Sequence, residues 1–269
     1  MRLGGPVRAT GNDPEEWILE LQKSGYTAAY CPDAAYRDSS EIAACREAAL
    51  KADIVIAEVG AWSNSISRDE GVRKSAIELC QSRLALAEEI GARCCVNISG
   101  SRGDKWDGPH PDNFSDETFQ LVVDSVREII DAVKPRHTFY TLETMPWIFP
   151  DSADGYLDLI RAIDRKAFAV HLDPVNLVSS PRRYFENGHL IQECFRKLGP
   201  YIKSCHAKDI ALSDGLTVHL SETRPGLGGL DYRMYLREIR SLGRDVPLML
   251  EHLPSMEEYR LAATYIRSL

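Results

Sequence analysis

The stretch "TFYTLETMPWIFPDSADGYLDLIRAIDRKAFAVHLDPVN", residues 138–176, shows most directly how this chain folds. It contains an apolar run over 138–147, an amphipathic run over 153–164 and a second apolar run over 168–176. Short apolar runs that alternate with an amphipathic helix predict parallel strands joined by a right-handed crossover. The stretch therefore predicts one strand–helix–strand unit.

The same alternation extends along the chain in both directions. Eight strand-like segments alternate with eight helix-like segments, and the strand-like ones are 2–7, 27–32, 53–62, 93–100, 138–147, 168–176, 202–210 and 247–254. No Ser/Gly-rich linker divides the 269 residues, and a (β/α)₈ barrel typically has about 250 residues. The sequence predicts an α/β fold with a single (β/α)₈ TIM barrel domain over residues 1–269.

The alternative architecture is an open doubly wound sheet. Such a sheet usually places a GxGxxG nucleotide fingerprint after its first strand, and "RLGGPVRATGN" has no such motif. The later glycine-rich segment "PGLGGLD", 225–231, favours a turn over a phosphate site, and turns at this end of a barrel often close over substrate.

Composition excludes several function classes. The net charge of −8 and the pI near 5.4 disfavour nucleic acid, because phosphate binding needs a basic face. No run approaches the ~18 apolar residues of a membrane span, and the first 17 residues lack the apolar core of a secretory signal. The seven scattered cysteines without CxxC indicate reduced, mostly buried thiols. We expect a cytoplasmic protein that acts on a small molecule, without nucleic-acid or membrane partners.

Polar residues lie near the ends of the last four apolar segments. They are Glu143 in "YTLETM", His171 and Asp173 in "AVHLDPVN", His206 and Lys208 in "SCHAKD", and Glu251 in "LMLEHL". Because side chains alternate between the two faces of a strand, residues two positions apart lie on the same face. We expect the face that carries these residues to point into the barrel. Three carboxylates and one imidazole then converge at the C-terminal mouth of the barrel.

Three adjacent carboxylates repel one another unless a proton or a cation relieves the repulsion. A shared divalent cation does so, and an oxygen-rich set with one imidazole suits Mn²⁺, Mg²⁺ or Co²⁺ better than structural zinc. We predict one divalent ion, Mn²⁺ before Mg²⁺, Co²⁺ or Zn²⁺. The alternative is a buried salt-bridge network in which Lys208 and Arg224 neutralise the acids.

The segments "LET", "HLDPVN", "CHAKD", "PGLGGLDY" and "LEH" resemble those of the xylose isomerase-like TIM barrel superfamily of sugar isomerases and epimerases. The resemblance is to ketose 3-epimerases and inosose-processing enzymes, and its motifs lie within residues 140–253. It implies metal ligation by Glu143, Asp173, His206 and Glu251. In the ketose 3-epimerase branch the two glutamates are also the acid/base pair, which here implies Glu143 and Glu251.

The implied reaction is proton transfer beside a carbonyl, through an enediolate, in a sugar or keto-sugar. One position departs from the epimerase pattern: Asn176 stands where those enzymes place a substrate-contacting histidine, and an amide does not exchange protons at neutral pH. A lyase or dehydratase acting on a keto-sugar, oxidised glycoside or inosose is therefore the main alternative. A barrel that binds a polyol without turnover, or that needs a partner subunit, is the other.

Several residues are further candidates for substrate contact. Asn176, Lys208 and Arg224 can bind substrate oxygens, and Glu58, at the end of the third strand-like segment, can bind a sugar hydroxyl. His171 shares a face with Asp173 but lies one layer deeper, which favours a core hydrogen bond. Three tryptophans follow strands on the mouth side, where rings stack on sugars: Trp62, Trp106 and Trp147. By resemblance alone, a homo-oligomer is also expected.

Overall fold

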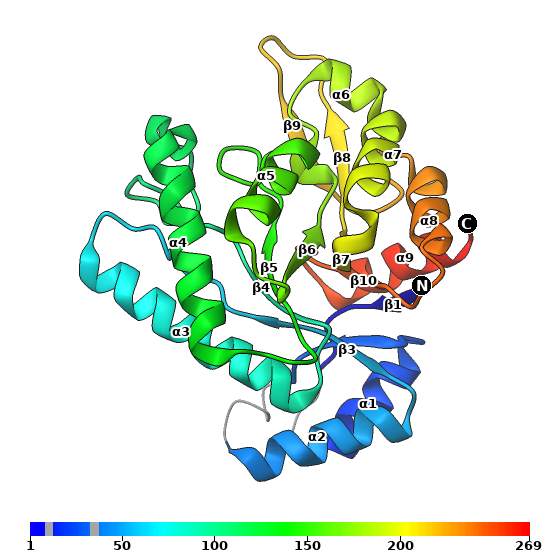
Figure 1. Ribbon diagram of the computed structural model, residues 1–269. Coiled ribbons are helices and arrows are strands. Elements are labelled where there is room, and N and C mark those ends of the chain that lie inside the picture. The colour runs from blue at the N-terminus through cyan, green and yellow to red at the C-terminus, as the bar shows by residue number, and fades with distance from the viewer. Residues whose placement is uncertain (9–12, 33–37) are drawn as a thin grey trace.

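A computed structural model describes residues 1–8, 13–32 and 38–269 of the chain. Within these ranges, eight parallel strands close into a barrel in the order β1-β10-β7-β6-β5-β4-β3-β2 (Figure 1). This confirms the predicted barrel. The strands are β1 Arg2–Gly4, β2 Ala28–Tyr30, β3 Val55–Gly60, β4 Cys94–Asn97, β5 Tyr140–Glu143, β6 Phe168–Leu172, β7 Ile202–Ala207 and β10 Pro247–Leu250.

Helices follow the barrel strands along the chain and surround the barrel (Figure 1). They are α1 Pro14–Lys23, α2 Ser39–Lys51, α3 Glu70–Ile90, α4 Asp116–Val133, α5 Ala153–Ile163, α6 Pro181–Phe185, α7 Asn187–Leu198, α8 Tyr232–Ser241 and α9 Met256–Arg267. Side-chain oxygens of Asp69, Ser115 and Ser152 accept backbone N–H groups at the first turns of α3, α4 and α5, which fixes where these helices begin. No helix in the described ranges is both long and apolar enough to cross a membrane.

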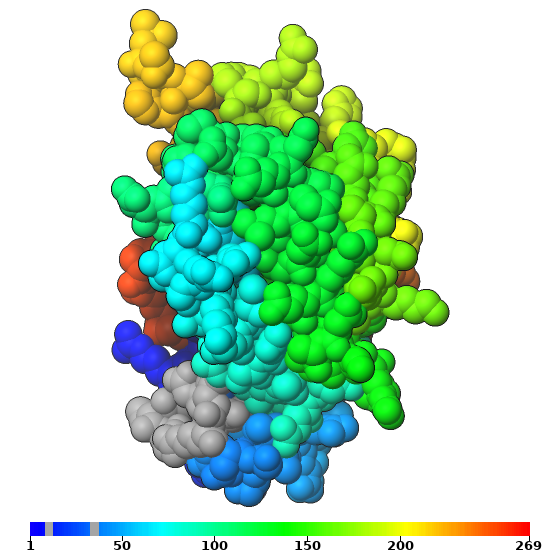
Figure 2. Space-filling model, turned by 60° about the vertical axis from the view of Figure 1, so that its left-hand side comes forward, coloured from blue at the N-terminus to red at the C-terminus, as the bar shows by residue number. Residues whose placement is uncertain are grey.

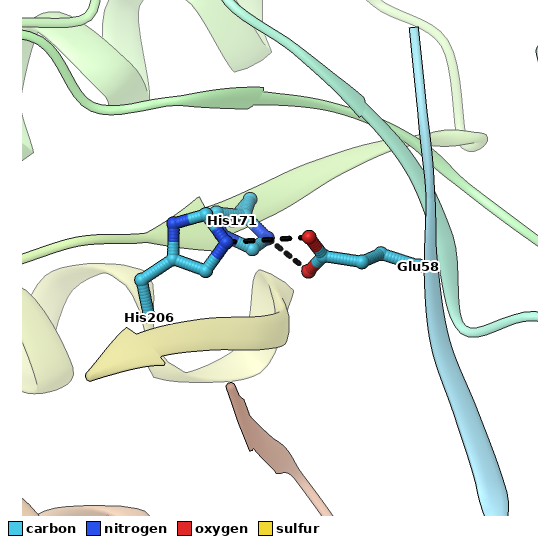
Figure 3. Close-up of side chains that lie close together, drawn as sticks. All are labelled: Glu58, His171 and His206. Atoms are coloured by element: carbon cyan, nitrogen blue, oxygen red, sulfur yellow. Dashed lines mark hydrogen bonds and ion pairs between the residues drawn. The ribbon is translucent and has the colours of Figure 1, made fainter. Parts of the chain in front are cut away.

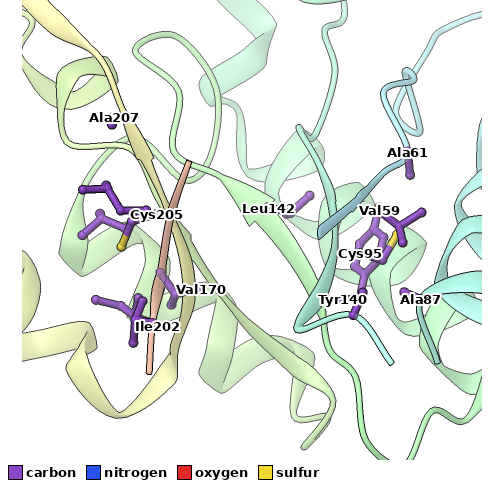
Figure 4. Packing of buried hydrophobic residues seen from close by; sticks show 14 of the residues in the cluster. Val59, Ala61, Ala87, Cys95, Tyr140, Leu142, Val170, Ile202, Cys205 and Ala207 are labelled. Carbon is purple, nitrogen blue, oxygen red and sulfur yellow. The ribbon is translucent and has the colours of Figure 1, made fainter. Parts of the chain in front are cut away.

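The main hydrophobic core lies between the strands and the helices. Alternate residues of the strands enter it, among them Leu142 of β5, Val170 of β6 and Cys205 of β7 (Figure 4). All seven cysteines are buried. Because side chains alternate along a strand, the neighbours Glu143 and His206 project to the opposite face, into the barrel.

A two-stranded antiparallel hairpin, which the sequence analysis did not predict, lies between β7 and α8. It consists of β8 Asp209–Leu212 and β9 Leu220–Thr223, paired in register from Asp209 with Thr223 to Leu212 with Leu220. The hairpin projects at one end of the molecule beside α6 (Figures 1 and 2), and Leu216 in its loop is fully exposed. Its base returns the chain to the barrel mouth.

Candidate metal centre

The four side chains predicted as metal ligands meet at the C-terminal mouth of the barrel. Glu143 ends β5, Asp173 directly follows β6, His206 lies in β7, and Glu251 directly follows β10. Each offers one ligand atom, and these atoms all lie within 4.8 Å of one another. Strand register brings them together, since Glu143 pairs with His171 across β5 and β6, and Met249 pairs with His206 across β10 and β7.

Lys208 lies among the three carboxylates. Its Nζ is 2.6 Å from Glu251 Oε1, 2.8 Å from Asp173 Oδ2 and 3.4 Å from Glu143 Oε1. Burial opposes the charge on Glu143, but the Lys208 ammonium and His206 hold the pKa of that carboxyl well below its usual range. At Asp173 burial prevails over Lys208 and raises the pKa to about 6. At Asp173 one ammonium therefore does not fully offset burial together with the neighbouring Glu143 and Glu251 carboxylates.

His206 has an acidic group at each ring nitrogen. Its Nδ1 lies 2.7 Å from Glu251 Oε1 and 3.1 Å from Glu143 Oε1. Its Nε2 lies 3.2 Å from Glu58 Oε1 of β3 (Figure 3). Burial would lower the pKa of His206, but the three carboxylates together raise it well above its usual value.

Backbone and amide donors orient two of the proposed ligands, Asp173 and Glu143. Asp173 Oδ1 accepts the N–H of Val175 at 2.9 Å, in the short 3₁₀ turn Val175–Leu177 that follows "DP". Asn176, in the same turn, donates from Nδ2 to Glu143 Oε1 at 3.1 Å and to the Thr144 carbonyl at 3.0 Å. The turn after β6 therefore fixes carboxylates on two neighbouring strands.

The donor set fits a divalent cation. Within the described ranges, Asp173 Oδ2 and Glu251 Oε1 are buried and have no hydrogen bond of good geometry, although Lys208 Nζ approaches both and His206 Nδ1 approaches Glu251 Oε1. In the same ranges Lys208 is also the one Lys or Arg within 4.0 Å of the three carboxylates. An excess of buried negative charge, with two oxygens left without a hydrogen bond, is the environment that a hard cation stabilises.

A cavity of about 570 Å³ opens above these ligands. Glu143 and Glu251 form part of its floor, together with Lys208, Asn176 and Glu58. Five aromatic side chains contribute to the walls: Tyr30, Trp62, Trp106, Trp147 and Tyr259. Trp62 and Trp106 remain 42% and 40% exposed, so part of each ring is open to solvent. A cavity of this size accommodates a small organic molecule.

Two residues predicted to contact substrate lie elsewhere. Arg224 pairs through Nε with Glu258 at 2.8 Å and lines a neighbouring pocket with Thr223 and Leu227. His171 is fully buried beneath the cavity, 3.5 Å from Glu58 through Nδ1, and neither ring nitrogen has a hydrogen bond to any described residue. Burial lowers the pKa of His171 to about 4, which keeps the ring neutral.

Sequence reasoning did not identify Glu222 and His252 as cavity residues. Glu222, in β9, lies 3.2 Å from His252 Nδ1 through Oε1, and both line the cavity. The hydrogen bond to Glu222 raises the pKa of His252. For Glu222 the sequence did contain a signal: the alternating segments "DIAL" and "LSET" on either side of "SDG" are typical of a hairpin.

Comparisons with known proteins agree with this barrel architecture. A family model described as "Xylose isomerase-like TIM barrel" matches residues 18–269. No curated protein sequence matches the chain. Similar solved structures include D-psicose 3-epimerase from Clostridium cellulolyticum H10, with TM-score 0.70 and 16% identity over 100% of this chain and 99% of that one.

Two further solved structures are similar at comparable identity. The probable 3-DHS dehydratase from Bacillus anthracis has TM-score 0.69 and 16% identity over 98% of this chain and 97% of that chain. A xylose isomerase-like TIM barrel protein from Mycobacterium smegmatis, in complex with magnesium, has TM-score 0.67 and 17% identity over 95% of this chain and 87% of that chain. At these identities the likeness establishes the shared fold.

Proposed function

The chain belongs to the xylose isomerase-like TIM barrel family, and from that premise we propose that it is a divalent-metal-dependent isomerase or epimerase of a sugar or keto-sugar. The observation that carries this proposal is the convergence of Glu143, Asp173, His206 and Glu251 at the barrel mouth, where Glu143 and Glu251 also line the cavity. Such a set holds a cation where a bound polyol can reach it.

In this proposal, Glu143, Asp173, His206 and Glu251 hold the cation, and Glu143 and Glu251 also transfer protons. The bound cation supplies positive charge that stabilises the negative charge developing on substrate oxygens as an enediolate forms. One glutamate removes the proton beside the carbonyl, and the other returns one. Return to the opposite face of the same carbon gives epimerisation, and return to the adjacent carbon gives isomerisation.

Other cavity residues position the substrate. Asn176 keeps Glu143 directed at the cavity through its hydrogen bond to Oε1. Lys208 offers a donor to a substrate oxygen, and the exposed faces of Trp62 and Trp106 are available to the C–H face of a sugar ring. The ligand set of three oxygens and one nitrogen favours Mn²⁺, with Mg²⁺, Co²⁺ and Zn²⁺ as alternatives.

A lyase or dehydratase acting on a keto-sugar, oxidised glycoside or inosose is the second candidate. Asn176 favours it, because the amide cannot exchange a proton with substrate, and a dehydratase is among the structurally similar proteins. A barrel that binds a polyol without turnover, or acts with a partner subunit, is the third. A homo-oligomer and a cytoplasmic location remain predictions.

Elemental analysis tests the proposal first. Protein purified without chelator is compared with the double variant Glu143→Gln/Asp173→Asn, and about one Mn, Co, Mg or Zn per chain is expected in the wild type only. Candidate sugars are then incubated with the loaded enzyme in D₂O, where proton transfer beside a carbonyl incorporates solvent deuterium. A wild type that binds none of these cations after incubation with each would overturn the proposal.

A further inference from the structure

The imidazole of His206 is held on the side away from the proposed metal ligands by a second group of buried side chains. Glu58 Oε1 lies 3.2 Å from His206 Nε2, and Ser204 Oγ donates to Glu58 Oε2 at 3.2 Å. Glu58 is 1% exposed, and Ser204 and His206 are fully buried. Figure 3 shows the Glu58 carboxylate, from β3, directed at the rings of His206 and His171.

These contacts determine which nitrogen of His206 keeps its proton once a cation is bound. A neutral imidazole has one donor nitrogen and one acceptor nitrogen, and an ionised carboxylate only accepts. Without a cation, carboxylates face both ring nitrogens, and Nδ1 is nearer to Glu251 and Glu143 than Nε2 is to Glu58. When a cation occupies the four-ligand set, Nδ1 must present its lone pair to the ion, and the proton of the neutral ring lies on Nε2, where Glu58 accepts it. A hydrogen bond from the second nitrogen to a carboxylate is the usual support for a metal-bound histidine.

The ring is also fixed in orientation. His171 packs edge-on against His206, with ring centroids 4.1 Å apart and planes at 73°, and His171 Nδ1 lies 3.5 Å from Glu58 Oε2. Each Glu58 oxygen thus already has a protein partner: Oε1 faces His206, and Oε2 faces Ser204 and His171. The sugar-hydroxyl role predicted for Glu58 from the sequence would add a further donor to oxygens that already face these partners.

We propose that Glu58 is a positioning residue that fixes His206 in the Nε2-protonated tautomer, so that Nδ1 is the nitrogen that binds the divalent cation. The proposal rests on the metal centre of the proposed function. It assigns Glu58 to the support of a ligand rather than to the substrate. It also predicts one cation per chain: the ligand atoms of Glu58, His171 and His206 lie within 4.8 Å of one another as well, but a second ion there would displace the proton that Nε2 donates to Glu58.

The test measures metal affinity and the ring nitrogens, independently of turnover. Zn²⁺ is titrated by calorimetry into metal-free wild type, Glu58→Gln and Glu88→Gln. Glu88 is a matched control, because its carboxylate also accepts hydrogen bonds, from the backbone of His137 and Thr138 before β5. We expect about 10- to 100-fold weaker Zn²⁺ binding for Glu58→Gln and unchanged binding for Glu88→Gln, with one Zn²⁺ per wild-type chain.

The second measurement is nitrogen-15 NMR of the histidine rings in Zn²⁺-loaded wild type. The His206 signals are identified as those missing from the spectrum of His206→Gln. Protonated Nε2 and metal-bound Nδ1 support the proposal. Metal-bound Nε2, two Zn²⁺ ions per chain, or wild-type affinity in Glu58→Gln would each overturn it while leaving the metal centre intact. A wild type that binds no Zn²⁺, Mn²⁺, Mg²⁺ or Co²⁺ overturns the proposed function as well. If Glu58→Gln does not fold, the nitrogen-15 measurement on His206 of the Zn²⁺-loaded wild type tests the proposal by itself.

Discussion

Asn176 is the residue at which this chain departs from the epimerase pattern, and it contacts a proposed proton-transfer group directly. Replacing Asn176 with Ala removes the 3.1 Å hydrogen bond to Glu143 Oε1. A hydrogen bond to a charged group contributes about 1.5–3 kcal/mol, so we expect kcat for solvent-deuterium incorporation to fall about 10- to 100-fold. Metal content should stay at the wild-type value, because all four proposed ligands remain.

The variant Asn176→Asp sharpens this test. It keeps the size of the side chain but replaces the donor with a carboxylate beside Glu143, which adds like charge. A larger loss of kcat than in Asn176→Ala is expected. Equal kcat in the wild type and both variants would show that Asn176 does not position Glu143.

Glu251 separates a catalyst from a binding protein. In Glu251→Gln the amide keeps an oxygen for the cation but cannot accept a proton. We expect at least about 100-fold lower kcat for deuterium incorporation, measured at saturating cation, as for the loss of a general base. A barrel that only binds a polyol would instead lose ligand affinity, measured by calorimetry, in step with its metal affinity.

The convergence of the four proposed ligands could be anticipated from the sequence, because each lies at or near the end of an apolar segment and alternation determines the face on which it lies. The role of Glu58 could not. Its partner His206 lies 148 positions away, and only the closed barrel brings β3 opposite β7. For Arg224 the sequence predicted a substrate contact, from its position in the turn before α8. In the structure its side chain instead pairs with Glu258, near the start of α9.

Among the elements, the hairpin β8–β9 and the turn after it depend on one buried carboxylate. Asp209, 1% exposed, accepts the backbone N–H groups of Ile210 and Leu230 through Oδ1, and those of Gly226 and Gly228 through Oδ2, at 2.8–3.1 Å. The glycine-rich segment 225–231 thus forms a turn around the side chain of Asp209, which agrees with the turn favoured from the sequence. A Cβ on Gly228 would lie 2.3 Å from Asp209 Oδ1, so the close approach requires glycine.

We expect Asp209→Asn to destabilise the protein. The amide presents N–H groups where the backbone already donates, so at least one buried donor loses its acceptor, and the free energy of unfolding should fall by about 2–4 kcal/mol. Urea unfolding measures the loss. Asp214→Asn, at an exposed position of the hairpin loop, is the control and should change stability by less than about 0.5 kcal/mol. An equally small change for Asp209→Asn would contradict the structural role.

The hairpin itself was missed because its strands are short and follow β7 after one residue. "IKSCHAKDI" reads as one continuous segment, and its phase gives no reason to end β7 at Ala207 and begin β8 at Asp209. Only the turn chemistry around Asp214 and Gly215 marks the reversal. Glu222 was missed with it, because it lies in β9 and reaches the cavity only where the hairpin returns.

At the scale of the whole molecule, the repeated alternation was sufficient to predict the barrel, because parallel strands joined by crossover helices have few compact arrangements. The barrel also concentrates its destabilising charges at one end. Glu143, Asp173 and Glu251, brought from three strands, share one buried ammonium. Any cation that binds them therefore stabilises the folded chain relative to the unfolded one.

This linkage predicts how metal removal affects thermal stability. A cation at 100 times its dissociation constant stabilises the folded state by about 2.7 kcal/mol, and in a chain of this size each kcal/mol raises Tm by about 2–4 °C. We therefore expect EDTA to lower the Tm of loaded protein by about 5–10 °C in differential scanning calorimetry, and Mn²⁺ in excess of EDTA to restore it. The double variant Glu143→Gln/Asp173→Asn should show the same Tm with and without Mn²⁺, because the ion then lacks two ligands. An equal Mn²⁺ response in this variant would place the stabilising ion elsewhere in the molecule, and no response in the wild type would leave Lys208 and His206 as the counter-charges to the three acids.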